Sequence, residues 1–199
     1  MFLVGQEAWP PCEECEEVVF MPDPILQVSI RYMIDNPYCP ICANDLYDMG
    51  ATIGLSLPSR FIFDLRGLEY CTSLEWMRFD DNLINDLSPL AGLTNLTALY
   101  LKGNRITDIG PLAGLTDLFD LRLDDNEIED LTPLIELVDP HALYLMNNRI
   151  SDIAPLVDNP GIDRTDQVHL EGNPLSSTSC TVYIPELESR GVRVYHDCP

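Results

Sequence analysis

A repeat of 22 residues between Ser73 and Pro160 constrains the fold more than any other feature of the sequence. Four rows follow one another: SLEWMRFDDNLINDLSPLAGLT, NLTALYLKGNRITDIGPLAGLT, DLFDLRLDDNEIEDLTPLIELV and DPHALYLMNNRISDIAPLVDNP. A fixed period of this length is typical of a solenoid, in which each unit buries its apolar edge against its neighbours. The sequence therefore predicts a single elongated domain.

Each row contains the same short set of structural signals. Leu99 and Leu101 alternate with Tyr100, which predicts a short strand with one face directed inward. An asparagine follows each strand, and because an amide at a bend can bond to backbone groups, we predict a buried asparagine column. Its members are Asn82, Asn104, Asn126, Asn148 and Asn173. A recurring aspartate, usually three residues ahead of a proline, predicts the cap of a short helical turn. These aspartates are Asp64, Asp86, Asp108, Asp130 and Asp152.

The repeat pattern changes at both ends of the chain. Asp23 as N-cap and Pro24 at the first helical position predict a helix, and a second short helix is expected over Ala43–Met49. Near the other end the period slips at Gly161–Thr165, followed by a predicted helix over Glu186–Arg190 and a final strand over Val192–Tyr195. We expect four parts: an acidic cysteine-containing segment (1–22), a helical N-terminal cap (23–50), the repeats (51–175) and a C-terminal cap (176–199).

Seven cysteines fall into three groups. Cys12, Cys15, Cys39 and Cys42 form two C-x-x-C pairs, a spacing that suits either a tetrahedral zinc site or two disulfides. Because the chain is expected to be exported, disulfides are favoured, and zinc and then free thiols are the alternatives. Cys71 occupies a core leucine position and is expected to be a small buried hydrophobic residue. Cys180 and Cys198 flank the end cap, and we expect them to be bridged.

The charge balance excludes several classes of protein. With 11 basic and 33 acidic residues, the formal net charge is −22. Nucleic acids require a basic footprint, and anionic membrane surfaces repel such a chain. No run approaches the roughly 18 apolar residues of a membrane span. Met1–Ala8 is too short for a signal peptide and lacks its basic flank, so the signal of an exported protein would lie upstream.

Catalytic and metal-binding motifs are weak in this sequence. None of its three histidines, His141, His169 and His196, has an obvious nucleophile beside it, and no glycine-rich phosphate loop is present. We therefore predict a protein that is not an enzyme and has no cofactor. The aspartate pairs of the turns have two interpretations, calcium ligands across adjacent coils or a solvated acidic face; they are Asp80 with Asp81 and Asp124 with Asp125.

The row L-x-x-L-x-L-x-x-N-x-I-x-D-[IL]-x-P-L-x-x-L resembles the 22-residue leucine-rich repeat of bacterial internalin-like proteins, over about residues 51–175. The start FMPDPILQVSIRYMI and the end NPLSSTSCTVYIPELESRGVRV also resemble caps of secreted bacterial members. The resemblance implies a curved right-handed solenoid of the α/β class, with a parallel sheet on the concave face and short helical turns on the convex face. It also implies a binding role without catalysis. The cysteine-rich entry departs from the family pattern.

Strand positions that point away from the core are the candidate binding residues. They are Trp76, Arg78, Tyr100, Lys102, Arg122, Tyr144 and His169. Tyrosine, tryptophan and arginine carry much of the energy of protein interfaces, and an alternating stripe of Arg and Tyr favours stacking. The alternative interpretation is a solvated sheet face whose long side chains merely shield the strands.

We therefore predict a monomeric, secreted or envelope-located protein that binds a protein partner through its concave face. The arginines of the stripe favour a partner that carries acidic groups. Carbohydrate or cell-wall binding is the alternative, since Trp76, Tyr100 and Tyr144 are suited to stacking on sugar rings. A structural spacer within a larger surface protein is a further alternative.

Overall fold

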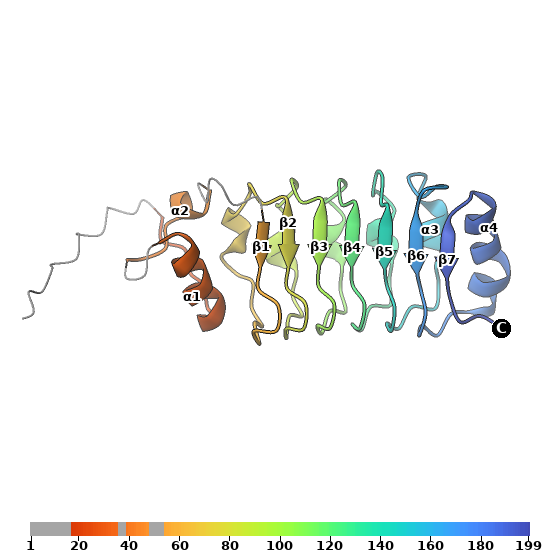
Figure 1. Cartoon of the computed structure of the whole chain (residues 1–199), viewed down its shortest axis with the longest axis horizontal. Helices are drawn as coiled ribbons and strands as arrows, with labels where there is room; N and C mark the ends of the chain where they lie inside the picture. Colours follow the sequence, from red (N-terminus) through yellow and green to blue (C-terminus); the bar gives the residue numbers. More distant parts are fainter. Residues whose placement is uncertain (1–16, 36–38, 48–53) are drawn as a thin grey trace, which may run out of the picture.

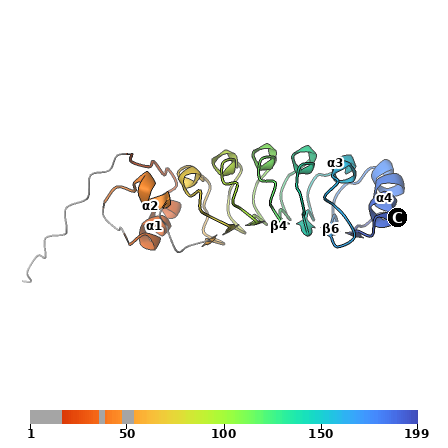
Figure 2. The same cartoon turned by 90° about the horizontal axis from the view of Figure 1, so that it is seen from above.

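The computed structural model describes residues 17–35, 39–47 and 54–199. Within this part, seven short strands form one parallel sheet in chain order. The strands are β1 (Gly54–Ser56), β2 (Trp76–Arg78), β3 (Ala98–Tyr100), β4 (Asp120–Arg122), β5 (Ala142–Tyr144), β6 (Gln167–His169) and β7 (Arg193–Tyr195). They line one long side of the solenoid, and the helical turns lie on the opposite side (Figures 1 and 2). The predicted leucine-rich-repeat architecture is confirmed.

The register of the sheet follows the sequence period and then departs from it. Leu55 pairs with Met77 and Leu121 pairs with Leu143, each 22 residues apart. Beyond β5 the spacing grows, because Leu143 pairs with Val168 and Val168 pairs with Val194. The segment between β5 and β6 contains the insertion that was expected at Gly161–Thr165, and the segment between β6 and β7 contains the helices of the C-terminal cap. The pairing therefore stays in register even where the sequence period is lost.

Each coil closes with a short helical turn. The turns are η1 (Leu68–Tyr70), η2 (Ser88–Leu90), η3 (Gly110–Leu112), η4 (Thr132–Leu134) and α3 (Ala154–Asp158). We had expected the recurring aspartate to be the N-cap of each turn, but from η2 to α3 it lies one residue before the N-cap. Ile109 is the N-cap of η3, and Asp108, one residue earlier, accepts a hydrogen bond at 2.7 Å from the N–H of Gly110. The carboxylate reaches two residues forward because the tight 3₁₀ turn leaves that N–H without a helical partner.

The asparagines lie in one column that links successive coils and is buried except at the half-buried Asn173. Oδ1 of Asn104 accepts from the N–H of Ile84 in the preceding coil at 3.1 Å. Its Nδ2 donates to the carbonyls of Phe79 and Leu101, both at 2.9 Å. The same pattern recurs at Asn82, Asn126, Asn148 and Asn173. One asparagine side chain per coil thus bonds to backbone N–H and C=O groups of the turns, which have no partner in a helix or strand.

A helical cap covers the N-terminal end of the stack, where the first coil has no preceding coil. It contains α1 (Pro24–Met33) and α2 (Ala43–Tyr47); the expected continuation of α2 to Met49 lies outside the described residues. Asp23 caps α1 through Oδ1, which accepts from the N–H groups of Ile25 and Leu26. Its Oδ2 accepts from the N–H of Phe63, so the fully buried carboxylate also ties the cap to the first coil.

The C-terminal cap contains more helix than the sequence predicted. A π-helical segment, η5 (Ser179–Tyr183), leads directly into α4 (Ile184–Ser189). In this π turn the N–H of Ile184 donates to the carbonyl of Ser179. We had placed the helix start at Pro185, but proline only removes one N–H donor, and the π turn lets the helix continue through it.

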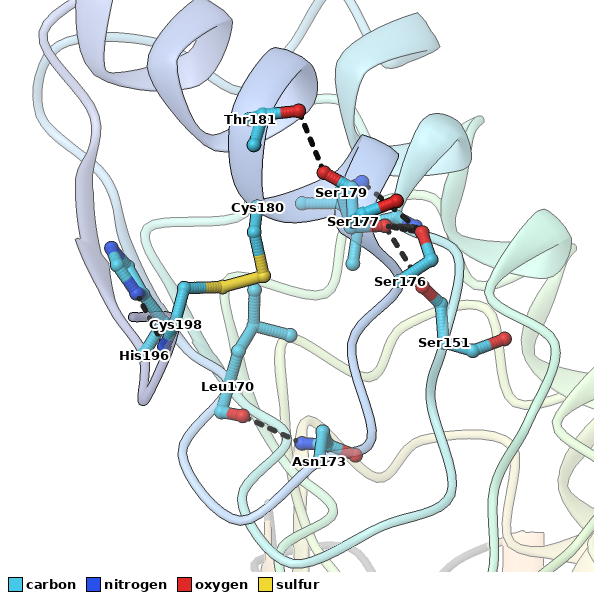
Figure 3. The surroundings of a disulfide bond; sticks show 11 residues. Ser151, Leu170, Asn173, Ser176, Ser177, Ser179, Cys180, Thr181, His196 and Cys198 are labelled. Atoms are coloured by element: carbon cyan, nitrogen blue, oxygen red, sulfur yellow. Dashed lines mark hydrogen bonds between the residues drawn. A yellow bond between two sulfur atoms is a disulfide. The ribbon is translucent and has the colours of Figure 1, made fainter.

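The C-terminal cap is fastened to the last coils by covalent and polar contacts (Figure 3). The predicted disulfide between Cys180 and Cys198 is present and joins the start of the helical segment to the end of the chain. The fully buried Ser179 donates through its hydroxyl to the carbonyl of Ser151 at 2.8 Å. Because this bond spans 28 residues, it docks the cap helix onto the preceding coil.

The remaining cysteines differ in their environments. Cys71 is fully buried in the core and free, and burial raises the pKa of its thiol to about 12. Cys39 and Cys42 are disulfide-bonded. Cys12 and Cys15 lie outside the described residues, so the pairing of the four entry cysteines and the zinc alternative stay predictions. Among the described helices, none is long and apolar enough to cross a membrane.

Candidate binding surface

The parallel sheet presents one outward-facing surface, here called the strand face. Central strand residues such as Leu99 and Leu121 are fully buried, so the residues on either side of them point outward. The register aligns the last residue of each strand into one row across the sheet, called the central column. Its members are Ser56, Arg78, Tyr100, Arg122, Tyr144, His169 and Tyr195.

Five members of the central column stack on one another. The guanidinium carbon of Arg122 lies 5.1 Å from the ring centre of Tyr100 and 4.5 Å from that of Tyr144. The rings of Tyr144 and His169 are 4.6 Å apart with planes at 11°, and those of His169 and Tyr195 are 4.2 Å apart with planes at 7°. Neighbouring strands are spaced at about 4.8 Å, which is close to the stacking distance of flat side chains.

The sequence analysis did not include Tyr195 in the site. Its position follows from the pairing of β7 with β6, which aligns Tyr195 with His169. That pairing spans 26 residues, so counting in steps of 22 does not reach Tyr195. The alternating pattern of Val192–Tyr195 predicted the strand, but only the register shows that its tyrosine extends the column.

Three basic residues of the strand face already have acidic partners within the chain. Arg78 Nε lies 2.7 Å from Asp80 Oδ2, and Lys102 Nζ lies 3.3 Å from Asp125 Oδ2. Arg122 Nε lies 3.5 Å from Asp120 Oδ1. The basic side chains remain about half exposed, so these pairs contribute little to stability. Their main effect is to neutralise the charges of Arg78, Lys102 and Arg122 locally.

Asp120 also engages the central column through a second bond. Its Oδ2 accepts from the hydroxyl of Tyr100 at 2.9 Å. Burial, together with this bond, raises the pKa of Tyr100. Asp120 therefore holds both Tyr100 and Arg122, and the first two members of the stack are oriented before any partner binds.

Trp76 lies beside the central column, at the N-terminal end of the strand face. A Cβ atom at Gly54, its register neighbour, would lie 1.8 Å from Cε2 of the indole. Any side chain larger than hydrogen would therefore displace Trp76. The absence of a side chain at Gly54 lets the partly exposed indole lie over β1.

The aspartate pairs of the turns have different roles at their two positions. Asp80 and Asp124 are buried, and each accepts the backbone N–H of the next coil, from Lys102 and Met146 respectively. Asp80 and Asp124 therefore do not belong to a solvated acidic face, which was our second interpretation of these pairs. Within the described part of the chain, no group of three or more His, Cys, Asp or Glu side chains is arranged to hold a metal ion.

The comparisons with known proteins agree with this geometry. The family model for leucine-rich repeats, in two copies, matches residues 72–114 and 94–136. A search of curated proteins found no match. The repeat family model and the parallel solenoid fold together show that the chain is a leucine-rich repeat protein.

Solved structures place the chain more narrowly. An internalin (inlF) from Listeria monocytogenes superposes with a TM-score of 0.73 at 26% identity, over 88% of this chain and 56% of the internalin. Internalin C2 (inlC2) from the same species gives a TM-score of 0.50 at 26% identity, over 94% of this chain and 100% of that one. A leucine-rich repeat protein of Leptospira interrogans, at 20% identity and a TM-score of 0.63, shares the fold over 79% of this chain and 39% of its own. The chain is an internalin-like leucine-rich repeat protein of the bacterial type, and it spans little more than half the length of the inlF structure.

Proposed function

We propose that this chain is a non-enzymatic module that binds a protein partner through the strand face. The observation that carries the proposal is the stacked central column from Tyr100 to Tyr195. Stacking restrains the side chains before binding, so little conformational entropy remains to be lost when a partner orders them. Aromatic and arginine side chains held in this way are typical of interface hot spots.

The same stack makes the column less suited to carbohydrate. Sugar rings bind against the open face of an aromatic ring, whereas the faces of Tyr144 and His169 are covered by their neighbours in the column. The edges of these rings are the parts directed outward. Carbohydrate binding is therefore our second candidate, supported chiefly by Trp76, whose ring lies over Gly54.

The disulfide of the C-terminal cap supports a location outside the cytoplasm. Structural disulfides form and persist in oxidising compartments, and the bond between Cys180 and Cys198 is of that kind. We propose an extracellular or envelope location and a monomeric state. The same environment would favour disulfides over zinc at the entry cysteines.

The proposal is tested by capturing partners from envelope and host-cell extracts, alongside a glycan array. Arg122→Ala and Tyr144→Ala are each expected to weaken capture of the same protein by at least about 30-fold, the effect of a hot spot of about 2 kcal/mol. Their unfolding midpoints should stay near that of the unmodified chain. Loss of glycan binding, rather than protein capture, in these variants would favour the second candidate.

Matched controls come from the opposite side of the solenoid. Glu136 and Asp158 are exposed residues beside the helical turns, so Glu136→Ala and Asp158→Ala should leave capture unchanged. If capture survives in both column variants and is lost in either control, the binding surface lies on the helical side and the proposal is wrong.

A further inference from the structure

The C-terminal end of the strand face holds a basic side chain that differs from the other three. Arg78, Lys102 and Arg122 each form an ion pair, whereas Arg193 at the start of β7 has no ion-pair partner within residues 17–35, 39–47 and 54–199. Its backbone N–H donates to the carbonyl of Asp166 at 3.0 Å, and its side chain is exposed. The guanidinium is thus the available cation of this surface.

The register surrounds Arg193 with hydrogen-bond donors. Gln167 is its direct neighbour on β6, and His169 is the neighbour of Tyr195 in the same strand pair. The hydroxyl of Tyr100 is engaged by Asp120, but in the described part of the chain the hydroxyls of Tyr144 and Tyr195 have no hydrogen-bond partner. A guanidinium, an amide and a tyrosine hydroxyl therefore project from two adjacent strands.

A second arginine lies close to the beginning of β7. A Cβ atom at Gly191, where φ is +92°, would lie 2.8 Å from Cβ of Arg164 and 3.2 Å from its Cα. The chain at Arg164 thus packs against Gly191, two residues before Arg193. Arg164 is exposed and likewise has no ion pair among the described residues. The backbone of a second arginine therefore lies near the start of β7, in a chain that has only 11 basic residues.

Acidic residues near this end already have contacts within the chain. Glu171 and Asp197 follow the ends of β6 and β7, and Glu171 Oε2 lies 3.7 Å from Nδ1 of His169. Asp197 Oδ2 also accepts from the N–H of Gly172. Asp166 is fully buried, and burial raises its pKa. The exposed Asp163 accepts the N–H of Thr165 through Oδ1.

We propose that Arg193, together with Gln167 and Tyr195, binds a carboxylate carried by an acidic side chain of the protein partner. A guanidinium forms two parallel bonds to a carboxylate. The Gln167 amide and the Tyr195 hydroxyl, which have no hydrogen-bond partner among the described residues, can complete its shell. This inference rests on the proposed function and gives its partner a chemical character. The sequence analysis assigned acid binding to Arg78 and Arg122, which form ion pairs within the chain. The inference assigns it instead to Arg193 in the C-terminal cap.

The probe for the test is a library of random twelve-residue peptides displayed on phage and selected on the immobilised chain at physiological salt. The selected peptides are expected to be enriched in Asp and Glu. Arg193→Gln should weaken the best peptide at least tenfold, and Arg193→Lys should restore part of the loss because the charge is kept. Arg105→Gln removes the same charge from an exposed turn and should have little effect.

A double-mutant cycle makes the assignment specific. Replacing each Glu of the best peptide by Gln should identify one position whose effect disappears in the Arg193→Gln protein and persists in the Arg105→Gln protein. Peptides without acidic enrichment, equal losses for the two arginine variants, or no coupled position would overturn the inference. If Tyr144→Ala abolishes peptide binding and Arg193→Gln leaves it unchanged, only the inference is overturned. If Tyr144→Ala leaves peptide binding unchanged, the result counts against the proposed function.

Discussion

Truncation of one asparagine of the buried column, Asn126→Ala, tests how the coils are held together. Oδ1 of Asn126 accepts from the N–H of Ile106 at 3.0 Å. Its Nδ2 donates to the carbonyls of Leu101 and Leu123, both at 3.0 Å. Asn126 is only 7% exposed, so water cannot readily replace these bonds.

The size of the effect follows from which groups lose every partner. The carbonyl of Leu101 also accepts from Asn104, and that of Leu123 also accepts from Asn148, so both keep one bond. The N–H of Ile106 has no other partner among the described residues. One buried N–H left unpaired costs about 2 kcal/mol, and two lost bonds cost about 1 kcal/mol each, so the expected destabilisation is about 4 kcal/mol.

Urea unfolding followed by circular dichroism measures the change. Asn95→Ala is the matched control, because Asn95 is an exposed asparagine whose Nδ2 makes one bond, to the carbonyl of Thr72 at 2.8 Å. Glu127→Ala removes an exposed ion pair with Arg149 and should cost less than about 1 kcal/mol. Equal midpoint shifts for Asn126→Ala and Asn95→Ala would refute the column as a source of stability.

Three further outcomes follow from the buried and bridged groups. With a pKa of about 12, the Cys71 thiol should resist iodoacetamide at pH 8 in the native protein and react on unfolding, as measured by mass spectrometry; rapid native labelling would contradict its burial. Burial raises the pKa of Asp124 above its value in the unfolded chain, so the protein loses stability as the pH rises through the pKa of the folded state. In urea titrations, Asp124→Asn should therefore be more stable than the unmodified chain at pH 7 but not at pH 3. Equal gains in stability at both pH values would contradict this direction of the pKa shift. Replacing Cys180 and Cys198 by Ser should cost about 3 kcal/mol by the same assay, the loop entropy of a bridge spanning 18 residues, and an unchanged midpoint would show that the bridge is dispensable.

The sequence was informative where residues repeat at a fixed spacing. The period of 22 defined the strands, their register from β1 to β5, the buried leucines and the position of the asparagines. It also placed Tyr100, Arg122 and Tyr144 on adjacent strands. A solenoid has contacts only between neighbouring coils, so the local pattern contains most of what the fold requires.

The tertiary structure decided what happens where the period is lost and how side chains choose their partners. The insertion after β5 and the pairing of β7 brought Tyr195 into the column and set Arg193 beside Gln167, neither of which a fixed count of residues predicts. Whether an arginine is free or neutralised depends on distances of a few ångströms between side chains, and residue types do not reveal it. Arg78 and Arg193 therefore look alike in the sequence, and only the fold distinguishes the paired arginine from the available one.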